Sequence, residues 1–153
     1  MDTQAPTSDS SQSPPSHVQE LANLQFLHCR PAQEERLVRL EDIVECIPMV
    51  QLDENHGVDN PRYRGLLHFR GRVVPVVDLF ADEHQPLELK WFLLVLRSGA
   101  QEIALVVREV FQISTYDAGN CERVHIGPVD TLTVVSSDSQ MLQVVEPDTL
   151  LNI

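Results

Sequence analysis

The chain has 153 residues, enough for one domain with a sizeable core, and it carries a formal net charge of −12. This acidic balance argues against nucleic acids and anionic membrane surfaces as partners, because both are bound by clustered Lys and Arg. No apolar run approaches the ~20 residues of a membrane span and the first residues lack the features of a signal peptide, so we expect a cytoplasmic protein without direct membrane insertion.

The N-terminal residues, 1–17, consist mainly of Ser, Pro, Gln, Thr and Asp. A segment of this composition buries almost nothing and cannot offset the entropy cost of folding. We therefore predict a disordered tail over 1–17 and one folded domain over 18–153.

Two strands and a helix are predicted at the start of this domain. The strands cover 24–28 and 36–39, and 31–35 has the composition of the hairpin loop between them. Apolar residues then recur at i, i+3, i+4 and i+7, the spacing of one helix face: Leu40, Ile43, Val44 and Ile47. Pro48 cannot continue a helix, so we expect one short internal helix over 40–47.

Two further strands, joined by a tight turn, follow a predicted exposed loop over 53–61. The strands cover 66–69 and 73–79, and Arg70-Gly71 between them is a hairpin signal because glycine accepts the positive φ of a tight turn. Pro75 cannot donate a hydrogen bond to a neighbouring strand. The second strand is therefore expected to lie at a sheet edge or to carry a bulge.

The rest of the chain predicts more short strands and a closing helix. Strands are expected over 91–96, 102–107, 110–114, 124–127, 132–135 and 141–145, with turns at 98–101, 117–120 and 136–139. Pro147 suits the first position of a short C-terminal helix that runs to Leu151. Many short strands with one internal helix indicate an all-β barrel or sandwich.

Residues that could support catalysis or metal binding are scattered along the chain. The histidines form no His-Glu-x-x-His motif and no zinc spacing with cysteine, and there is no phosphate-binding glycine loop. We interpret Cys46, close to the helix stripe, as a small core residue, and Asp78 as a turn cap. The three widely spaced cysteines, Cys29, Cys46 and Cys121, fit reduced thiols. We predict no enzymatic activity, no metal and no cofactor.

The hairpin contains a specific pattern: Gly65, two apolar residues, Arg70-Gly71, two more apolar residues, Pro75, two apolar residues and Asp78-Leu79. This pattern resembles the signature of CheW-like domains, the adaptors of bacterial chemosensory arrays. The resemblance covers about residues 21–151, with supporting segments at 102–110 and 141–151. It implies an all-β fold of two five-stranded SH3-like β-barrel subdomains with a groove between them, one short internal helix and a short C-terminal helix.

The resemblance also implies a function. CheW-like domains have no catalytic activity and couple chemoreceptors, the methyl-accepting chemotaxis proteins, to a CheA-type histidine kinase. One surface binds the cytoplasmic tip of the receptor, and another pairs with the kinase's own CheW-like regulatory domain. We accordingly expect a non-enzymatic adaptor at membrane-associated receptor arrays.

The receptor-binding residues are transferred from the family one at a time. Arg70 matches the arginine of the Arg-Gly turn that is associated with receptor coupling, and Glu45 matches the helix glutamate that pairs with it. Gly65 matches the glycine that opens the hairpin, and Ile43 matches an apolar helix position that faces the receptor. Without the resemblance, each has a plain structural explanation: a solvated turn, a polar helix face, a bend and the core.

The sequence also departs from the family pattern. His68 and Phe69 stand where the family commonly has Asn and Leu, and Arg108 replaces a frequent Asp. His68 and the turn glycine Gly71 complete the predicted receptor-binding set. Two other functions stay open: a small ligand- or signal-binding β-barrel, which a closed apolar pocket would indicate, and a hydrolase, which a His or carboxylate with a perturbed pKa in a cleft would indicate.

Overall fold

The computed structural model describes residues 23–54, 59–80, 86–126 and 129–152. The predicted tail over 1–17 and the start of the domain at 18 lie outside these residues, so both stay predictions. The described residues form three β-sheets, two short 3-10 helices and one short α-helix. The all-β fold class is confirmed.

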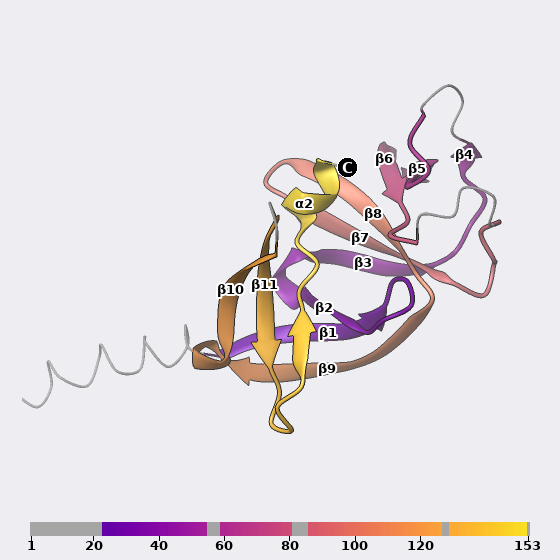
Figure 1. Cartoon of the computed structure of the whole chain (residues 1–153). Helices are drawn as coiled ribbons and strands as arrows, with labels where there is room; N and C mark the ends of the chain where they lie inside the picture. Colours follow the sequence, from indigo (N-terminus) through magenta and orange to yellow (C-terminus); the bar gives the residue numbers. More distant parts are fainter. Residues whose placement is uncertain (1–22, 55–58, 81–85, 127–128, 153) are drawn as a thin grey trace, which may run out of the picture.

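Two three-stranded sheets form what we call the small lobe (Figure 1). The first has the order β2-β1-β9, from β1 (Asn23–Arg30), β2 (Arg36–Arg39) and β9 (Glu109–Asp117). The second has the order β10-β11-β12, from β10 (Cys121–Ile126), β11 (Val129–Val135) and β12 (Met141–Gln143). A parallel bridge between Leu37 and Val144 connects the two sheets, and an apolar cluster that includes Phe26 and Val134 fills the space between them.

A six-stranded sheet forms the large lobe. Its order is β3-β7-β8-β6-β5-β4. The strands are β3 (Ile43–Pro48), β4 (Asp53–Glu54), β5 (Tyr63–Phe69), β6 (Arg72–Val77), β7 (Phe92–Ser98) and β8 (Gln101–Val107). The sheets thus hold three, three and six strands, and the division into two five-stranded barrels stays a prediction.

The buried apolar residues form three clusters, one of which joins the two lobes. One lies inside the large lobe and includes Trp91, and one lies inside the small lobe around Phe26. The third draws on both lobes, with Leu27 and Val38 from the small lobe and Leu94 and Leu105 from the large lobe. Because these residues are almost completely buried, separating the lobes would expose a continuous apolar surface, and the two lobes pack as one body.

The internal helix predicted over 40–47 is wrong. Only Leu40–Asp42 form a 3-10 helix, η1, and the chain then continues as strand β3, which pairs with β7. Three of the four apolar residues at helical spacing are β-branched, and such residues fit a pleated strand as well as a helix face. The pairing with β7 is what makes this segment a strand. The interpretation of Cys46 as a core residue fails with the helix, because Cys46 is exposed on β3.

The second strand of the hairpin is a partial edge strand, as Pro75 predicted. Strand β6 pairs with β5 along its length, but it pairs with β8 only at Val76 and Val77. Pro75 therefore has a neighbouring strand on one side only, where its missing N–H costs no ladder bond. The expected loop over 53–61 differs from the structure, since Asp53–Glu54 form the short edge strand β4 beside β5.

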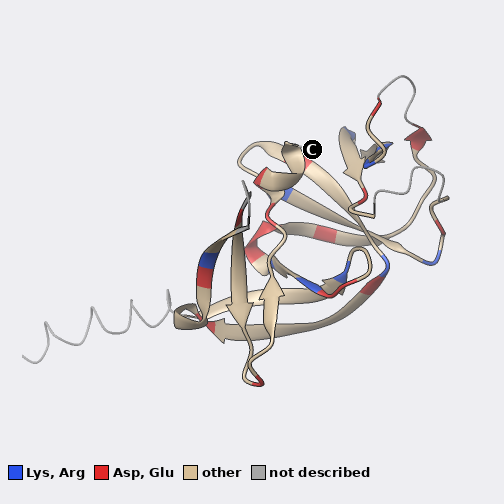
Figure 2. Cartoon of the chain, viewed as in Figure 1, with Lys and Arg blue, Asp and Glu red and all other residues tan. Residues whose placement is uncertain are grey.

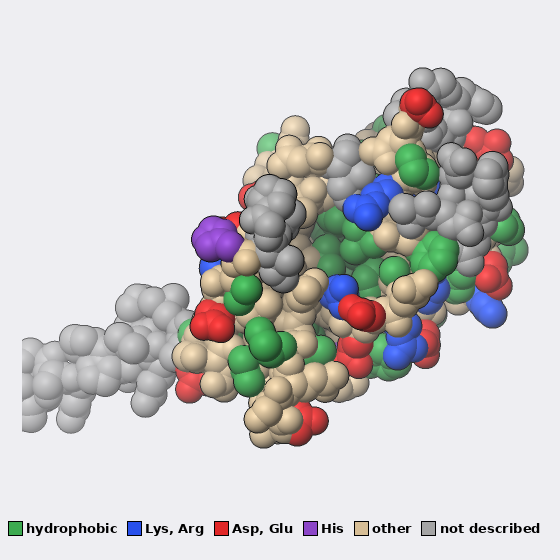
Figure 3. All heavy atoms as spheres, viewed as in Figure 1, with side chains coloured by type: hydrophobic (Ala, Val, Ile, Leu, Met, Phe, Trp, Pro, Cys, Tyr) green, Lys and Arg blue, Asp and Glu red, His purple; other side chains and the backbone are tan. Residues whose placement is uncertain are grey.

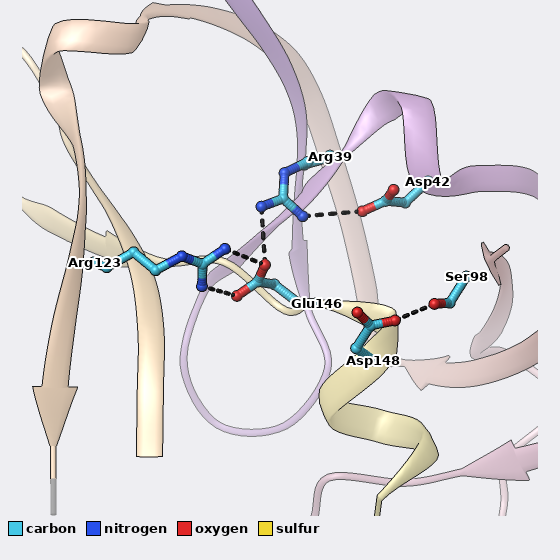
Figure 4. Close-up of polar contacts among 6 residues, drawn as sticks. All are labelled: Arg39, Asp42, Ser98, Arg123, Glu146 and Asp148. Carbon is cyan, nitrogen blue, oxygen red and sulfur yellow. Dashed lines mark hydrogen bonds and ion pairs between the residues drawn. The ribbon is translucent and has the colours of Figure 1, made fainter. Parts of the chain in front are cut away.

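The C-terminal helix α2 (Pro147–Leu151) matches its prediction and is anchored by ion pairs (Figure 4). Glu146, which precedes the helix, accepts hydrogen bonds from Arg123 on β10 at 2.7 and 2.9 Å and from Arg39 on β2 at 2.9 Å. Arg39 also pairs with Asp42 of η1. The Glu146 carboxylate therefore links β2 of one small-lobe sheet, β10 of the other and the start of α2.

Candidate partner-binding site

The turn of the β5–β6 hairpin projects Arg70 into solvent. Arg70 and Gly71 both have positive φ, 52° and 76°, as a two-residue type I′ turn requires. The pairing of Phe69 with Arg72 closes the turn, and a Cβ added at Gly71 would meet nothing within 4 Å. The tip is therefore a tight turn with open space around it.

Arg70 is exposed but held in one direction. Its guanidinium forms an ion pair with Glu45 and lies 5.0 Å from the centre of the Phe69 ring. The Arg70 side chain is 61% exposed and that of Glu45 is 36% exposed. Glu45 belongs to β3, at the opposite edge of the sheet order, so the sheet curls enough for the hairpin tip to meet β3. The structure thus brings together the two residues that the resemblance paired.

The other predicted receptor-binding residues lie in different surroundings. Gly65 has a φ of 128°, and a Cβ there would lie 2.1 Å from the carbonyl oxygen of Asp53, so glycine is required for β4 to approach β5. His68 is exposed on β5 and its Nε2 lies 2.5 Å from the Asp53 carboxylate. Ile43 is partly buried against the cluster shared by the two lobes. Its side chain therefore contributes to the core more than to a surface.

A second arginine of the hairpin was missed by the sequence reasoning. Arg72 donates two hydrogen bonds to Glu102 of β8, at 2.7 and 3.0 Å. Its guanidinium carbon lies 5.5 Å from the centre of the Phe69 ring. These bonds hold the pKa of the Glu102 carboxyl below its usual value. The available signal was the Arg-Gly-Arg triplet, in which Arg70 lies in the turn and Arg72 begins the strand after it. The candidate site is therefore the exposed tip of the hairpin, where Arg70 and Arg72 are each paired with an acid of another strand.

The described residues form three clefts. The first has a volume of about 480 Å³ and mixes apolar and charged lining, including Leu79, Val145, Arg36 and Glu34. Figure 3 shows a hollow with hydrophobic side chains at its floor and charged side chains at its rim, open to solvent. The second, about 320 Å³, is bordered by α2. The third, about 610 Å³, lies on the large lobe beside Met49 and Leu87. None of the three is the closed apolar pocket that a small-ligand function predicts.

The described residues also lack a catalytic arrangement. No group of three or more His, Cys, Asp or Glu among them could hold a metal ion. Burial raises the pKa of the Cys29 thiol to about 12, and partial loss of solvation raises the pKa of the Cys46 thiol, so neither is an activated nucleophile. Asp78 is fully buried and accepts the backbone N–H of Phe80 at 3.0 Å, which confirms the turn-cap interpretation.

An all-β body with an exposed, ion-paired hairpin has the features of a protein-binding scaffold. The family model of the CheW-like domain matches residues 25–153, and the chain belongs to this family. The family consists of non-enzymatic scaffold and adaptor proteins of chemotaxis.

The structure is similar to a crystal structure of the scaffolding protein TtCheW from Thermoanaerobacter tengcongensis. The TM-score is 0.69 at 16% sequence identity, over 81% of this chain and 84% of that chain, and this likeness supports the fold. No curated protein matches the chain. Among the described residues, no helix is long and apolar enough to cross a membrane.

Proposed function

We propose that this chain is an adaptor that couples the cytoplasmic tips of chemoreceptors to the regulatory domain of a CheA-type histidine kinase, at membrane-associated receptor arrays. The observation that carries the proposal is the ion pair between Arg70 and Glu45 on the β5–β6 hairpin. An exposed guanidinium that is already oriented can form directional bonds to a partner's carboxylates or carbonyls with little further loss of side-chain entropy.

The charge distribution supports a contact through the hairpin. The protein is strongly acidic as a whole, and acidic positions occur on both lobes (Figure 2). The hairpin tip departs from this background, because Arg70 and Arg72 offset the charges of Glu45 and Glu102. A partner with exposed carboxylates is therefore repelled less by the hairpin tip than by much of the remaining surface.

The mechanism of such an adaptor is geometric. A rigid β-body with two separate protein-binding surfaces holds the receptor tip and the kinase domain in a fixed relation. The shared apolar cluster supplies that rigidity, because the lobes cannot separate without exposing it. In an array each contact needs only modest affinity, since linked contacts raise the effective concentration of every partner.

Reversing the charge at Arg70 tests the proposal. Arg70→Glu should keep the fold, because substitutions of exposed residues rarely change stability by more than about 0.5 kcal/mol. Binding to the receptor tip should fall at least ~10-fold, because the new carboxylate faces Glu45 and the partner's acids. Binding to the kinase domain should persist. Two binding isotherms, one per partner, with circular dichroism as the folding control, measure these outcomes.

Arg30→Glu is a closely matched control. Arg30 is also partly exposed, pairs with an acid of a neighbouring strand, Glu109, and lies over an aromatic ring, Phe111, at 5.3 Å. Its guanidinium bonds within the small lobe, and the substitution keeps the Arg30 backbone carbonyl, so receptor binding should not change. Unchanged receptor affinity in a folded Arg70→Glu variant would refute the assignment of the hairpin. Equal loss of both partners would refute the two-surface mechanism.

A further inference from the structure

A buried ion cluster lies at the base of the β5–β6 hairpin. Asp78 directly follows β6 and has no exposed surface. Its carboxylate accepts two hydrogen bonds from Arg108, at 2.5 and 2.9 Å, and one from Arg64 of β5 at 3.1 Å. The Asp78 backbone N–H donates to the carbonyl of Arg62 at 2.8 Å. Asp78 therefore fixes both chains of the hairpin where it leaves the body of the protein.

Arg108 connects this base to the small lobe. It lies between β8 and β9, where the chain passes from the large lobe to the small lobe (Figure 1). Its Nη1 donates to the carbonyl of Pro31 at 2.6 Å, and its backbone N–H donates to the carbonyl of Arg30 at 2.8 Å. Its guanidinium carbon lies 4.2 Å from the centre of the Trp91 ring, which belongs to the core of the large lobe.

We propose that Arg108 is a positioning residue: through Asp78 it clamps the base of the β5–β6 hairpin to the β1–β2 loop, and so sets the direction in which Arg70 is presented to a partner. The clamp stands on its own contacts, whereas its consequence for receptor binding rests on the proposed function.

Only arginine meets the geometric demands of this position. The two bonds to Asp78 are parallel and bidentate, a third bond goes to a carbonyl, and the planar group stacks on an indole ring. Lysine keeps the charge but cannot form the bidentate pair and the stack at the same time. Arg108→Lys therefore separates the clamp from the simple presence of a buried cation.

Hydrogen exchange of the full chain tests the clamp without any partner. In Arg108→Lys, amides of the β5–β6 hairpin and of the 31–35 loop should exchange about 10-fold faster or more, while amides of β10 and β11 keep their rates. The matched control is Glu102→Gln, which disrupts the other bidentate pair of the same hairpin, at its tip, and should leave exchange at the base unchanged. A uniform acceleration in all strands, or no acceleration at the hairpin base, would overturn the proposal.

A second variant keeps the test decisive if Arg108→Lys folds poorly. The triple substitution of Asp78→Leu with Arg64→Met and Arg108→Met removes all three charges of the cluster, so no buried charge there loses its counter-ion and the variant should fold. The proposal expects its hairpin amides to exchange about 10-fold faster than in the wild type despite a similar Tm. Protection equal to that of the wild type would show that apolar packing alone positions the hairpin.

Receptor binding then connects the clamp to function. If wild-type protein binds the receptor tip, Arg108→Lys should weaken binding several-fold while kinase binding stays within twofold. If wild-type protein binds no receptor tip, the proposed function fails, but the exchange result still decides whether the clamp exists. Faster exchange at the hairpin with unchanged receptor affinity would refute the step from clamp to presentation.

Discussion

At the scale of single residues, the carboxylate of Glu146 is the clearest electrostatic contribution to stability. Hydrogen bonds from Arg123, helped by Arg39, lower its pKa from 4.5 to about 2 in the folded protein. Because the pKa is lower in the folded than in the unfolded chain, the ionised carboxylate stabilises the fold at pH values above about 4.5. This contribution disappears as the pH falls from about 4.5 to 2. The shift corresponds to about 3 kcal/mol when it is fully expressed.

Glu146→Gln should therefore lower the free energy of unfolding at neutral pH by about 2 to 3 kcal/mol and flatten its decline between pH 4.5 and 2. Urea denaturation at a series of pH values measures both effects. Glu122→Gln, at an exposed position of β10, is the control and should leave the profile unchanged. A Glu146→Gln profile that falls as steeply in acid as the wild type would contradict the role of this carboxylate.

At the scale of elements, Gly65 decides whether β4 can pair with β5. Gly65→Ala places a Cβ where the Asp53 carbonyl lies, and the backbone also has a positive φ. We expect a loss of roughly 2 to 3 kcal/mol, with β4 detached. Gly99→Ala is the matched control: its φ is also positive, at 60°, but its space is open, so it should cost only about 1 kcal/mol. Thermal unfolding measures both, and equal losses would show that β4 contributes nothing.

At the scale of the whole molecule, the N-terminal segment is predicted to contribute almost nothing to the folded body. Residues 1–17 consist mainly of Ser, Pro, Gln, Thr and Asp. Deleting residues 1–17 should leave Tm within about 2 °C of the full chain, because the deleted segment has little apolar surface to bury. Calorimetry of the two lengths checks this expectation. A fall of many degrees would show that the segment packs on the body.

Much of the fold could be predicted because its signals are local. Arg70-Gly71 predicts a tight turn through the φ that glycine allows, Pro75 predicts an edge through its missing donor, and Pro147 marks the first turn of α2. Most predicted strand boundaries lie within a few residues of the observed ones, because turn residues also mark them locally. Each of these features depends on the conformational preference of one or two residues.

The segment 40–47 shows where local signals fail. Its apolar spacing fits a helix, but Glu45, Cys46 and Ile47 pair with β7, a strand some fifty residues later in the chain. Hydrogen bonds and packing across that distance outweigh a periodicity shared by helix and strand. The candidate site illustrates the same division: the sequence and its family resemblance pointed to Arg70 and Glu45, but the curl of the sheet brings them together.

The sequence by itself determined the all-β class, the hairpin and its turn, and the family to which the chain belongs, because these follow from residue type and short spacing. The tertiary structure alone decided that Arg72 is fixed by Glu102, that Ile43 packs in the core, and that Arg108 reaches Asp78 and Pro31 at once. These contacts join residues that are distant in the chain. No local preference encodes them, and only the packing of the two lobes brings their atoms within bonding distance.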